Sequence, residues 1–137
     1  MFVWCNFVVP NLMSELLYKE EVYVIAGAMF EVYKTLGIGF LEPVYQEALA
    51  VEFTKRSISF EREKSLQLFY KDVLLEKKYC PDFVCFGEII LELKVVPKLS
   101  NIEVAQLLNY LKITKMKLGL LANFGSTPHL EWKRYVL

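Results

Sequence analysis

Three side chains in the second half of the chain could together hold a metal ion and assist hydrolysis: Asp82, Glu92 and Lys94. Glu92 and Lys94 are two positions apart in an apolar run, so on a strand they point to the same face of the sheet. A turn at 86–88 would bring Asp82 opposite Glu92 on the neighbouring strand. Carboxylates, a backbone carbonyl and waters are the ligands that Mg²⁺ or Mn²⁺ prefers, and such an ion lowers the pKa of a bound water. The pattern predicts a divalent-metal site that hydrolyses phosphodiesters, in which Lys94 orients the water or adds positive charge.

Each of these residues also has a purely structural interpretation. Asp82 could be a carboxylate at a strand edge or in a turn. Glu92 and Lys94 could lie on the solvent face of an antiparallel strand and form a cross-strand ion pair. The neighbouring positions between 89 and 96 are apolar, however, and charged groups within such a run are costly unless they are paired or bind metal.

Hydrophobic periodicity, caps and turn residues predict the elements that position these side chains. Helices are expected over 15–36, 41–56 and 101–115. Strands are expected over 58–63, 66–70, 73–75, 79–86, 88–95, 118–122 and 130–136. Ser14 and Ser100 are the expected N-caps of the first and third helices, and Gly37 and Gly39 end the first. The result is a compact α/β domain with a mixed sheet flanked by helices.

Apolar residues at helical spacing predict which helix faces are buried. In the second and third helices these are Val44, Ala48, Val51, Ile102, Ala105 and Leu108, with Leu107 and Leu111 as further candidates. The three cysteines form no CxxC pair, which argues against a disulfide framework or a zinc site. Cys80 and Cys85 are therefore expected to be small core residues on a strand.

Composition limits the possible classes of protein. The chain has 137 residues, of which 55% are hydrophobic, enough for one domain with apolar surface left over for a homodimer interface. It contains no run of about 18 apolar residues, so no membrane span is predicted. Residues 1–12 are apolar but lack the basic start and small-residue cleavage site of a signal peptide, so a cytoplasmic location is expected. Met13 could be the natural start, which would make 1–12 an extension and 13–137 the domain.

The formal net charge is zero, so charge alone does not indicate a nucleic-acid-binding protein. Its distribution is uneven, because residues 64–137 carry 11 basic and 7 acidic side chains, a net charge of +4. Between 93 and 117 the charged residues other than Glu103 are all basic: Lys94, Lys98, Lys112, Lys115 and Lys117. This segment could contact phosphates. It could equally be a solvated helix face with lysines near the negative end of the helix dipole.

Two motifs give the chain a family resemblance. Pro81-Asp82, followed after ten residues by Glu92-Leu93-Lys94, resembles the signature of the PD-(D/E)XK nuclease superfamily. The segment 39–45, Gly-Phe-Leu-Glu-Pro-Val-Tyr, is similar to the GxxExxY pattern of a prokaryotic branch of that superfamily. The segments 105–111 and 119–125 provide further matches, so the resemblance extends over about 13–137.

The resemblance implies a restriction-endonuclease-like α-β-β-β-α-β core and a set of site residues. Asp82 and Glu92 would be the main metal ligands, the Leu93 carbonyl would complete the shell, and Lys94 would be the catalytic lysine. Glu42 would be an additional metal or water ligand, and Gln106 would face the site from the helix that follows. Pro43 places Glu42 near a helix start. If Glu42 were the N-cap itself, its carboxylate could bind backbone N–H groups instead.

Two more motif residues are tyrosines. Tyr45, one helical turn after Glu42, could hold that carboxylate or pack in the core, and packing is favoured; Tyr110 has no predicted role. The predicted function is Mg²⁺- or Mn²⁺-dependent cleavage of nucleic acid, with DNA as the expected substrate. The alternatives are a nucleic-acid-binding or protein-interaction module that keeps the nuclease fold without turnover, and a subunit that depends on a partner chain.

Overall fold

The computed structural model describes residues 2–3 and 17–137. The predictions for Cys5, for a start at Met13 and for the Ser14 cap lie outside these residues. The helices are α2 (Lys19–Leu36), α3 (Glu42–Lys55) and α4 (Asn101–Thr114). The strands are β1 (Phe2–Val3), β2 (Phe60–Arg62), β3 (Leu66–Tyr70), β4 (Val73–Tyr79), β5 (Phe83–Cys85), β6 (Ile89–Lys94), β7 (Leu118–Asn123) and β8 (Glu131–Val136).

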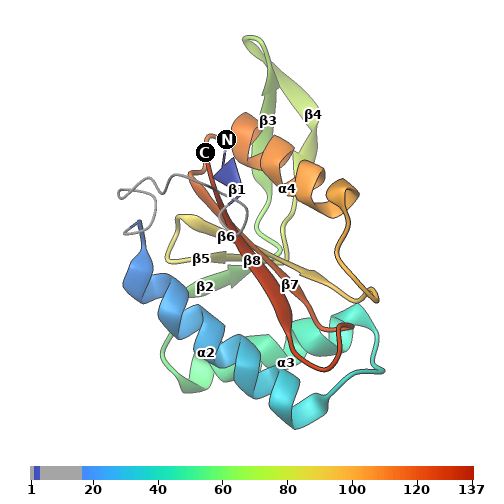
Figure 1. Ribbon diagram of the computed structural model, residues 1–137. Helices are drawn as coiled ribbons and strands as arrows, with labels where there is room; N and C mark the ends of the chain where they lie inside the picture. Colours follow the sequence, from blue (N-terminus) through green and yellow to red (C-terminus); the bar gives the residue numbers. More distant parts are fainter. Residues whose placement is uncertain (1, 4–16) are drawn as a thin grey trace.

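A six-stranded mixed sheet with the order β1-β8-β7-β6-β5-β2 forms the centre of the molecule. Strands β6 and β7 are parallel, and α4 makes the crossover between them, while the other neighbouring pairs are antiparallel. Strands β3 and β4 form a separate hairpin that projects from the body beside α4 (Figure 1). The mixed α/β fold with a restriction-endonuclease-like core is therefore confirmed.

The sheet is covered on both faces, so its central strand β6 is apolar except for Glu92 and Lys94. Leu91 and Leu93 face α2 and α3 in one hydrophobic cluster. Ile90 faces the other way, into a second cluster with α4 and the inner side of the hairpin. Glu92 and Lys94 are two and four residues after Ile90, so they point to the same face, the α4 side of the sheet.

Among the described residues, no helix combines the length and the apolar character that a membrane span requires.

The helix positions were predicted more accurately than their buried faces. Helix α2 begins at Lys19, after a turn at 17–18. In α3 the predicted stripe is wrong: Val44 and Val51 are exposed. The buried residues of α3 are Tyr45, Gln46, Leu49, Ala50 and Phe53.

The third helix shows the same pattern. The predicted N-cap Ser100 of α4 is confirmed, and it forms a capping box in which the Ser100 N–H donates to Glu103 over 2.8 Å. Ile102 is wrong as a core residue, at 77% exposed, and Ala105 is exposed as well. The buried residues are Leu107, Leu108 and Leu111. Of the two strand cysteines Cys85 is buried, but Cys80 is exposed because it lies in the bend between β4 and β5.

Candidate active site

Asp82, just before β5 begins, is hydrogen-bonded to both Glu92 and Leu93 of β6. The β5–β6 register pairs Phe83 with Leu91, which puts Asp82 opposite Glu92. The Asp82 N–H donates to Glu92 Oε1 over 3.0 Å, and the Leu93 N–H donates to Asp82 Oδ2 over 2.8 Å. The predicted turn at 86–88 therefore brings the two carboxylates together.

Lys94 ends β6 on the same face as Glu92, and the backbone around it is firmly held. Its carbonyl accepts a 2.8 Å hydrogen bond from the Phe124 N–H of the β7 end. Two residues on, the Val96 N–H donates to the buried Asn123 side chain over 3.0 Å. The Lys94 ammonium lowers the pKa of both Asp82 and Glu92, so its charge acts on the carboxylate pair.

Burial dominates the electrostatics of the carboxylates. It raises the pKa of Asp82 and Glu42, and for Glu42 the charge of Asp82 adds to the effect. Burial and then the charge of Asp82 raise the pKa of Glu92 to about 7. Lys94 opposes all three shifts without cancelling them. The cluster thus carries more negative charge than one ammonium compensates.

Glu42 reaches this cluster from the start of α3. It is the first residue of the helix, after the N-cap Leu41, so the interpretation of Glu42 as the N-cap is wrong. The preceding loop depends on Gly39, whose φ of 111° disfavours other residues. The buried Tyr45 hydroxyl donates to the Gly37 carbonyl over 2.6 Å, and its ring stacks on Phe124. Tyr45 therefore packs, as favoured, and anchors the loop that sets the position of Glu42.

Gln46 is a site neighbour that sequence reasoning missed. Its side chain, 8% exposed, donates from Nε2 to Asp82 Oδ1 over 2.9 Å. Its Oε1 accepts a 2.9 Å hydrogen bond from Arg62 Nη2 on β2. Glu42 and Gln46 are four residues apart and so share one face of α3. This four-residue spacing is the feature of the sequence that could have indicated Gln46 as a neighbour of the site.

A pair of stacked tyrosines lies on the other side of Glu92. The Tyr79 and Tyr110 rings are parallel within 8°, with centroids 3.7 Å apart. Burial, followed by the charge of Glu92, raises the pKa of Tyr79, whose hydroxyl is buried without a hydrogen-bond partner among the described residues. Tyr79 belongs to β4, at the base of the hairpin, and Tyr110 belongs to α4, so the stack joins these two elements beside the site. Tyr110, which had no predicted role, is the α4 member of this contact.

The other two predicted residues are placed differently. Leu93 directs its N–H toward Asp82, and because N–H and C=O of one strand residue point to the same side, its carbonyl also faces the Asp82 side. Gln106 is exposed on α4, and none of the hydrogen bonds found among the described residues joins it to Asp82, Glu92 or Lys94. The structure therefore groups Glu42, Asp82, Glu92 and Lys94, with the Leu93 backbone, and leaves Gln106 outside their hydrogen bonds.

The described residues contain no group of three His, Cys, Asp or Glu side chains arranged to hold a metal. A site with two carboxylates, one carbonyl and waters needs no such group, and Mg²⁺ usually retains several waters. Each carboxylate oxygen has two lone pairs, so Asp82 and Glu92 can keep their N–H bonds and still bind a cation. The uncompensated negative charge of Glu42, Asp82 and Glu92 also fits a divalent cation.

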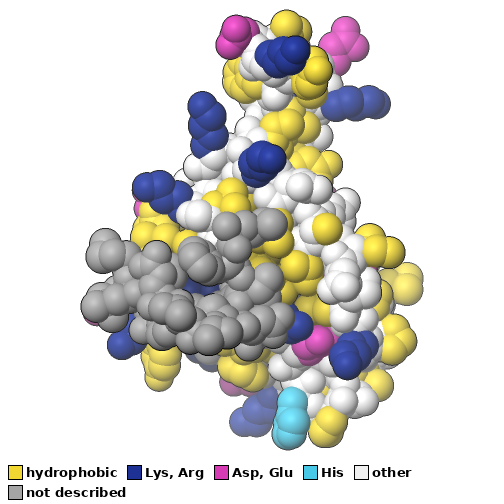
Figure 2. Space-filling view, turned by 45° about the horizontal axis from the view of Figure 1, so that its top comes forward, with side chains coloured by type: hydrophobic (Ala, Val, Ile, Leu, Met, Phe, Trp, Pro, Cys, Tyr) yellow, Lys and Arg dark blue, Asp and Glu magenta, His cyan; other side chains and the backbone are white. Residues whose placement is uncertain are grey.

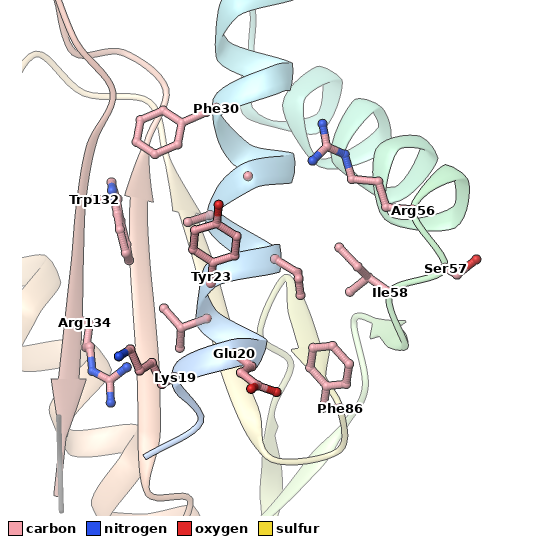
Figure 3. A pocket seen from close by; sticks show the side chains of 14 residues that line it. Lys19, Glu20, Tyr23, Phe30, Arg56, Ser57, Ile58, Phe86, Trp132 and Arg134 are labelled. Atoms are coloured by element: carbon pink, nitrogen blue, oxygen red, sulfur yellow. The ribbon is translucent and has the colours of Figure 1, made fainter. Parts of the chain in front are cut away.

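A wide groove lies away from these residues, along α2 and β8 (Figure 3). It is mainly apolar, with Tyr23 and Phe30 from α2 and Trp132 from β8 around it. Its lining includes none of Glu42, Asp82, Glu92 and Lys94. The apolar groove and the charged cluster therefore lie on separate surfaces. The cluster is the better candidate for catalysis, because it contains the carboxylates and the lysine.

An acidic pair and a lysine at one end of a sheet are groups that can hold a divalent metal ion and assist the hydrolysis of a phosphodiester. A family model for the PD-(D/E)XK nuclease superfamily matches residues 19–135. The match covers most of the chain, and the protein belongs to that superfamily. Comparisons with curated proteins and with solved structures returned no match. Members of the superfamily generally use divalent metals and act on nucleic acid.

Proposed function

We propose that this protein is a Mg²⁺- or Mn²⁺-dependent nuclease that cleaves DNA in the cytoplasm, with its site at Asp82, Glu92 and Lys94. One observation carries the proposal: the Asp82 N–H donates to the Glu92 carboxylate, the Asp82 carboxylate accepts from the Leu93 N–H, and Lys94 lies on the same face as Glu92. Carboxylates buried this deeply in a structural role would need compensating partners. Gln46 and the N–H groups of Asp82 and Leu93 donate to them, but with all the carboxylates ionised the single charge of Lys94 does not neutralise them.

The ligands we assign are the carboxylates of Asp82 and Glu92 and the carbonyl of Leu93, with Glu42 binding the metal or a metal-bound water. A divalent cation bound there supplies a water of lowered pKa and a positive charge for the phosphate oxygens. Gln46 keeps Asp82 oriented through its 2.9 Å hydrogen bond. Gln106 would join the site only when substrate is bound, because in this structure it is exposed.

Lys94 has the role of a donor in this mechanism. Its ammonium donates hydrogen bonds to the attacking water and to a non-bridging phosphate oxygen, and it stabilises the negative charge that grows in the transition state. The water oxygen bonds to phosphorus and releases one proton to solvent, the bond from phosphorus to the leaving oxygen breaks, and the leaving oxygen takes up a proton from solvent. The fixed end of β6 limits how far Lys94 can move during this step.

Within the superfamily we assign the chain to the GxxExxY branch, with 13–137 as one domain. The support is structural: Gly39, Glu42 and Tyr45 of that motif act together in one loop and helix start. We also propose a homodimer, since the apolar groove of Figure 3 provides surface that a second copy could cover.

Cleavage assays test the proposal. The purified chain is incubated with Mn²⁺ or Mg²⁺ and single-stranded, duplex or branched DNA, and products are separated on denaturing gels. Lys94→Ala should reduce the cleavage rate about 100-fold or more. Lys55→Ala, which removes an exposed lysine at the end of α3, should have no effect. Cleavage that survives Lys94→Ala would refute the site.

The alternative is a nuclease fold that binds nucleic acid or protein without turnover. The exposed position of Gln106, outside the hydrogen bonds of the site, favours it. Metal binding without cleavage of any DNA substrate would support this alternative. Cleavage that requires a co-purifying chain would instead support a partner-dependent subunit.

A further inference from the structure

A second groove, of about 690 Å³, lies between the β3–β4 hairpin and the C-terminal half of α4. Its lining comes from two sides: Phe69, Lys71 and Asp72 of the hairpin, and Asn109, Lys112 and Lys115 of α4 and its C-cap. We call it the hairpin groove. Figure 2 shows basic and hydrophobic side chains next to each other on the projecting part of the molecule, with some acidic groups.

The charge around the hairpin groove favours an anionic partner. The segments 71–78 and 112–117 contain Lys71, Lys77, Lys78, Lys112, Lys115 and Lys117. Their acidic residues are Asp72 and Glu76. The ion pairs found among the described residues join Arg56 to Glu52 and Lys64 to Glu61, so they involve none of these lysines. Of these residues, Lys71, Lys112, Lys115 and Asp72 line the groove itself, which leaves a net charge of +2 facing a ligand.

The helix dipole does not account for this arrangement. It explains lysines at the end of α4, such as Lys112 and Lys115. It does not explain Lys71, which enters the same groove from the hairpin turn. Phe69 is 47% exposed and Tyr70 is 63% exposed beside this lysine, whose ammonium lies 5.6 Å from the Tyr70 ring centroid. Lysines combined with exposed aromatic rings are the usual means of binding a nucleic-acid strand.

The hairpin groove is also connected to the candidate site. Asn109 of its lining precedes Tyr110, whose ring stacks on Tyr79 beside Glu92. The first turn of α4, which contains Glu103, follows Lys94 closely along the chain, and the last turn of the helix lines the groove, so the helix connects the site segment with the groove. Nine residues separate Glu103 from Lys112, a distance of about 14 Å along the helix axis. That length corresponds to about four nucleotide steps of a duplex strand.

We infer that the hairpin groove binds the sugar-phosphate backbone of the nucleic acid about four nucleotides from the phosphodiester at Asp82, Glu92 and Lys94. The inference rests on the proposed function for the identity of the ligand, but it assigns a separate binding surface. The β3–β4 hairpin contacts the nucleic-acid strand. Because the base of the hairpin packs on α4, it fixes the position of that nucleic-acid strand relative to the site. Its contacts are to phosphates, so they carry no sequence preference.

Binding is measured apart from cleavage. A fluorescein-labelled DNA oligonucleotide is titrated in EDTA, and gels check that it stays intact. Lys71→Ala/Lys112→Ala/Lys115→Ala should weaken binding about 10- to 100-fold at 0.1 M salt and reduce the slope of log K against log salt by about 3. The matched control is Lys19→Ala/Lys34→Ala/Lys55→Ala, which removes the same charge from exposed positions on α2 and α3. It should leave both quantities unchanged, and circular dichroism melting verifies that both variants fold.

Equal effects of the two triple variants, or no effect of either, would overturn the inference. So would loss of a solution dimer in light scattering without a change in DNA affinity, because the groove would then be an interface between copies. The proposed function fails differently: if Lys94→Ala leaves cleavage intact, the site is wrong while groove binding still stands. If neither DNA nor RNA oligonucleotides bind the wild-type chain, the groove inference fails whatever the cleavage assay shows.

Discussion

Glu92 is the residue whose protonation depends most on its surroundings in the candidate site. Burial and the charge of Asp82 raise its pKa from 4.5 to about 7. As the pH rises from about 4.5 to 7, the unfolded chain loses this proton before the folded chain does. The free energy of unfolding therefore falls over that range in the metal-free protein.

Glu92→Gln should remove most of this pH dependence. The variant stays neutral, so at pH 8 in EDTA we expect it to exceed the wild type by about 2–3 kcal/mol in unfolding free energy, with little difference near pH 4. Urea unfolding at several pH values measures this. Glu47→Gln, a change at an exposed position of α3, is the control and should track the wild type. Parallel pH profiles for all three proteins would contradict the assigned environment of Glu92.

Gln46 connects Asp82 to Arg62, and its removal should affect both stability and metal binding. Gln46→Ala deprives Asp82 Oδ1 of a donor, so we expect a loss of about 1–2 kcal/mol in unfolding free energy. It should also raise the Asp82 pKa further and weaken Mn²⁺ binding at pH 6 more than at pH 8. Urea unfolding and calorimetric Mn²⁺ titration test the two effects. Gln67→Ala, at an exposed position of β3, should produce neither.

The sequence revealed Asp82, Glu92 and Lys94 because each interrupts or borders an apolar run. The same reasoning could not select Gln46, since a glutamine on a helix is more often exposed and its partners Asp82 and Arg62 are distant in sequence. It also assigned Gln106 to the site from the motif, although its side chain is exposed on α4. The spacing of residues in a strand fixes the direction of a side chain better than the spacing in a helix whose orientation is unknown.

At the scale of elements, α3 shows why a buried face can be misassigned. Two apolar stripes compete on this helix, Val44-Ala48-Val51 and Tyr45-Leu49-Phe53. The stripe with the larger side chains is buried, because aromatic rings remove far more surface from water than valine or alanine. Hydrophobic periodicity located the helix. It could not show which of the two stripes faces the sheet, because that depends on how the helix packs in the folded protein. Helix α4 differs in the same way, with Ile102 off the stripe that contains Leu107 and Leu111.

Two glycines in different elements should respond oppositely to alanine. A Cβ on Gly125 would lie 2.7 Å from the Val96 carbonyl oxygen and 2.8 Å from its nitrogen, both backbone atoms beyond the end of β6. Gly125→Ala should therefore cost about 1–3 kcal/mol and displace the segment next to Lys94. Gly27→Ala, inside α2, meets only the flexible end of Arg56 and should gain about 0.5–1 kcal/mol. Urea unfolding of both variants tests this, and a neutral Gly125→Ala would contradict the close approach of β6 and β7 ends.

The excess negative charge of Glu42, Asp82 and Glu92 links metal binding to the stability of the whole molecule. A cation that binds only the folded chain raises the free energy of unfolding by about 2.7 kcal/mol at 100 times its Kd. For 137 residues this corresponds to a rise of about 9 °C in the unfolding midpoint. The rise should grow from pH 6 to pH 8, because Glu92 must lose its proton to bind the cation and its pKa is about 7.

Calorimetric melts with Mn²⁺ or with EDTA, at pH 6 and at pH 8, measure this linkage. Asp82→Asn/Glu92→Gln should abolish the rise at both pH values, and in EDTA it should melt higher than the wild type at pH 8, since two repelling carboxylates are gone. Glu47→Gln should keep the full metal response. A midpoint that rises equally with Mn²⁺ in the double variant would place the cation elsewhere, and a cluster that needs no cation would show no rise in any of the proteins. Because the readout is stability, the result holds even if the substrate for cleavage has not been found.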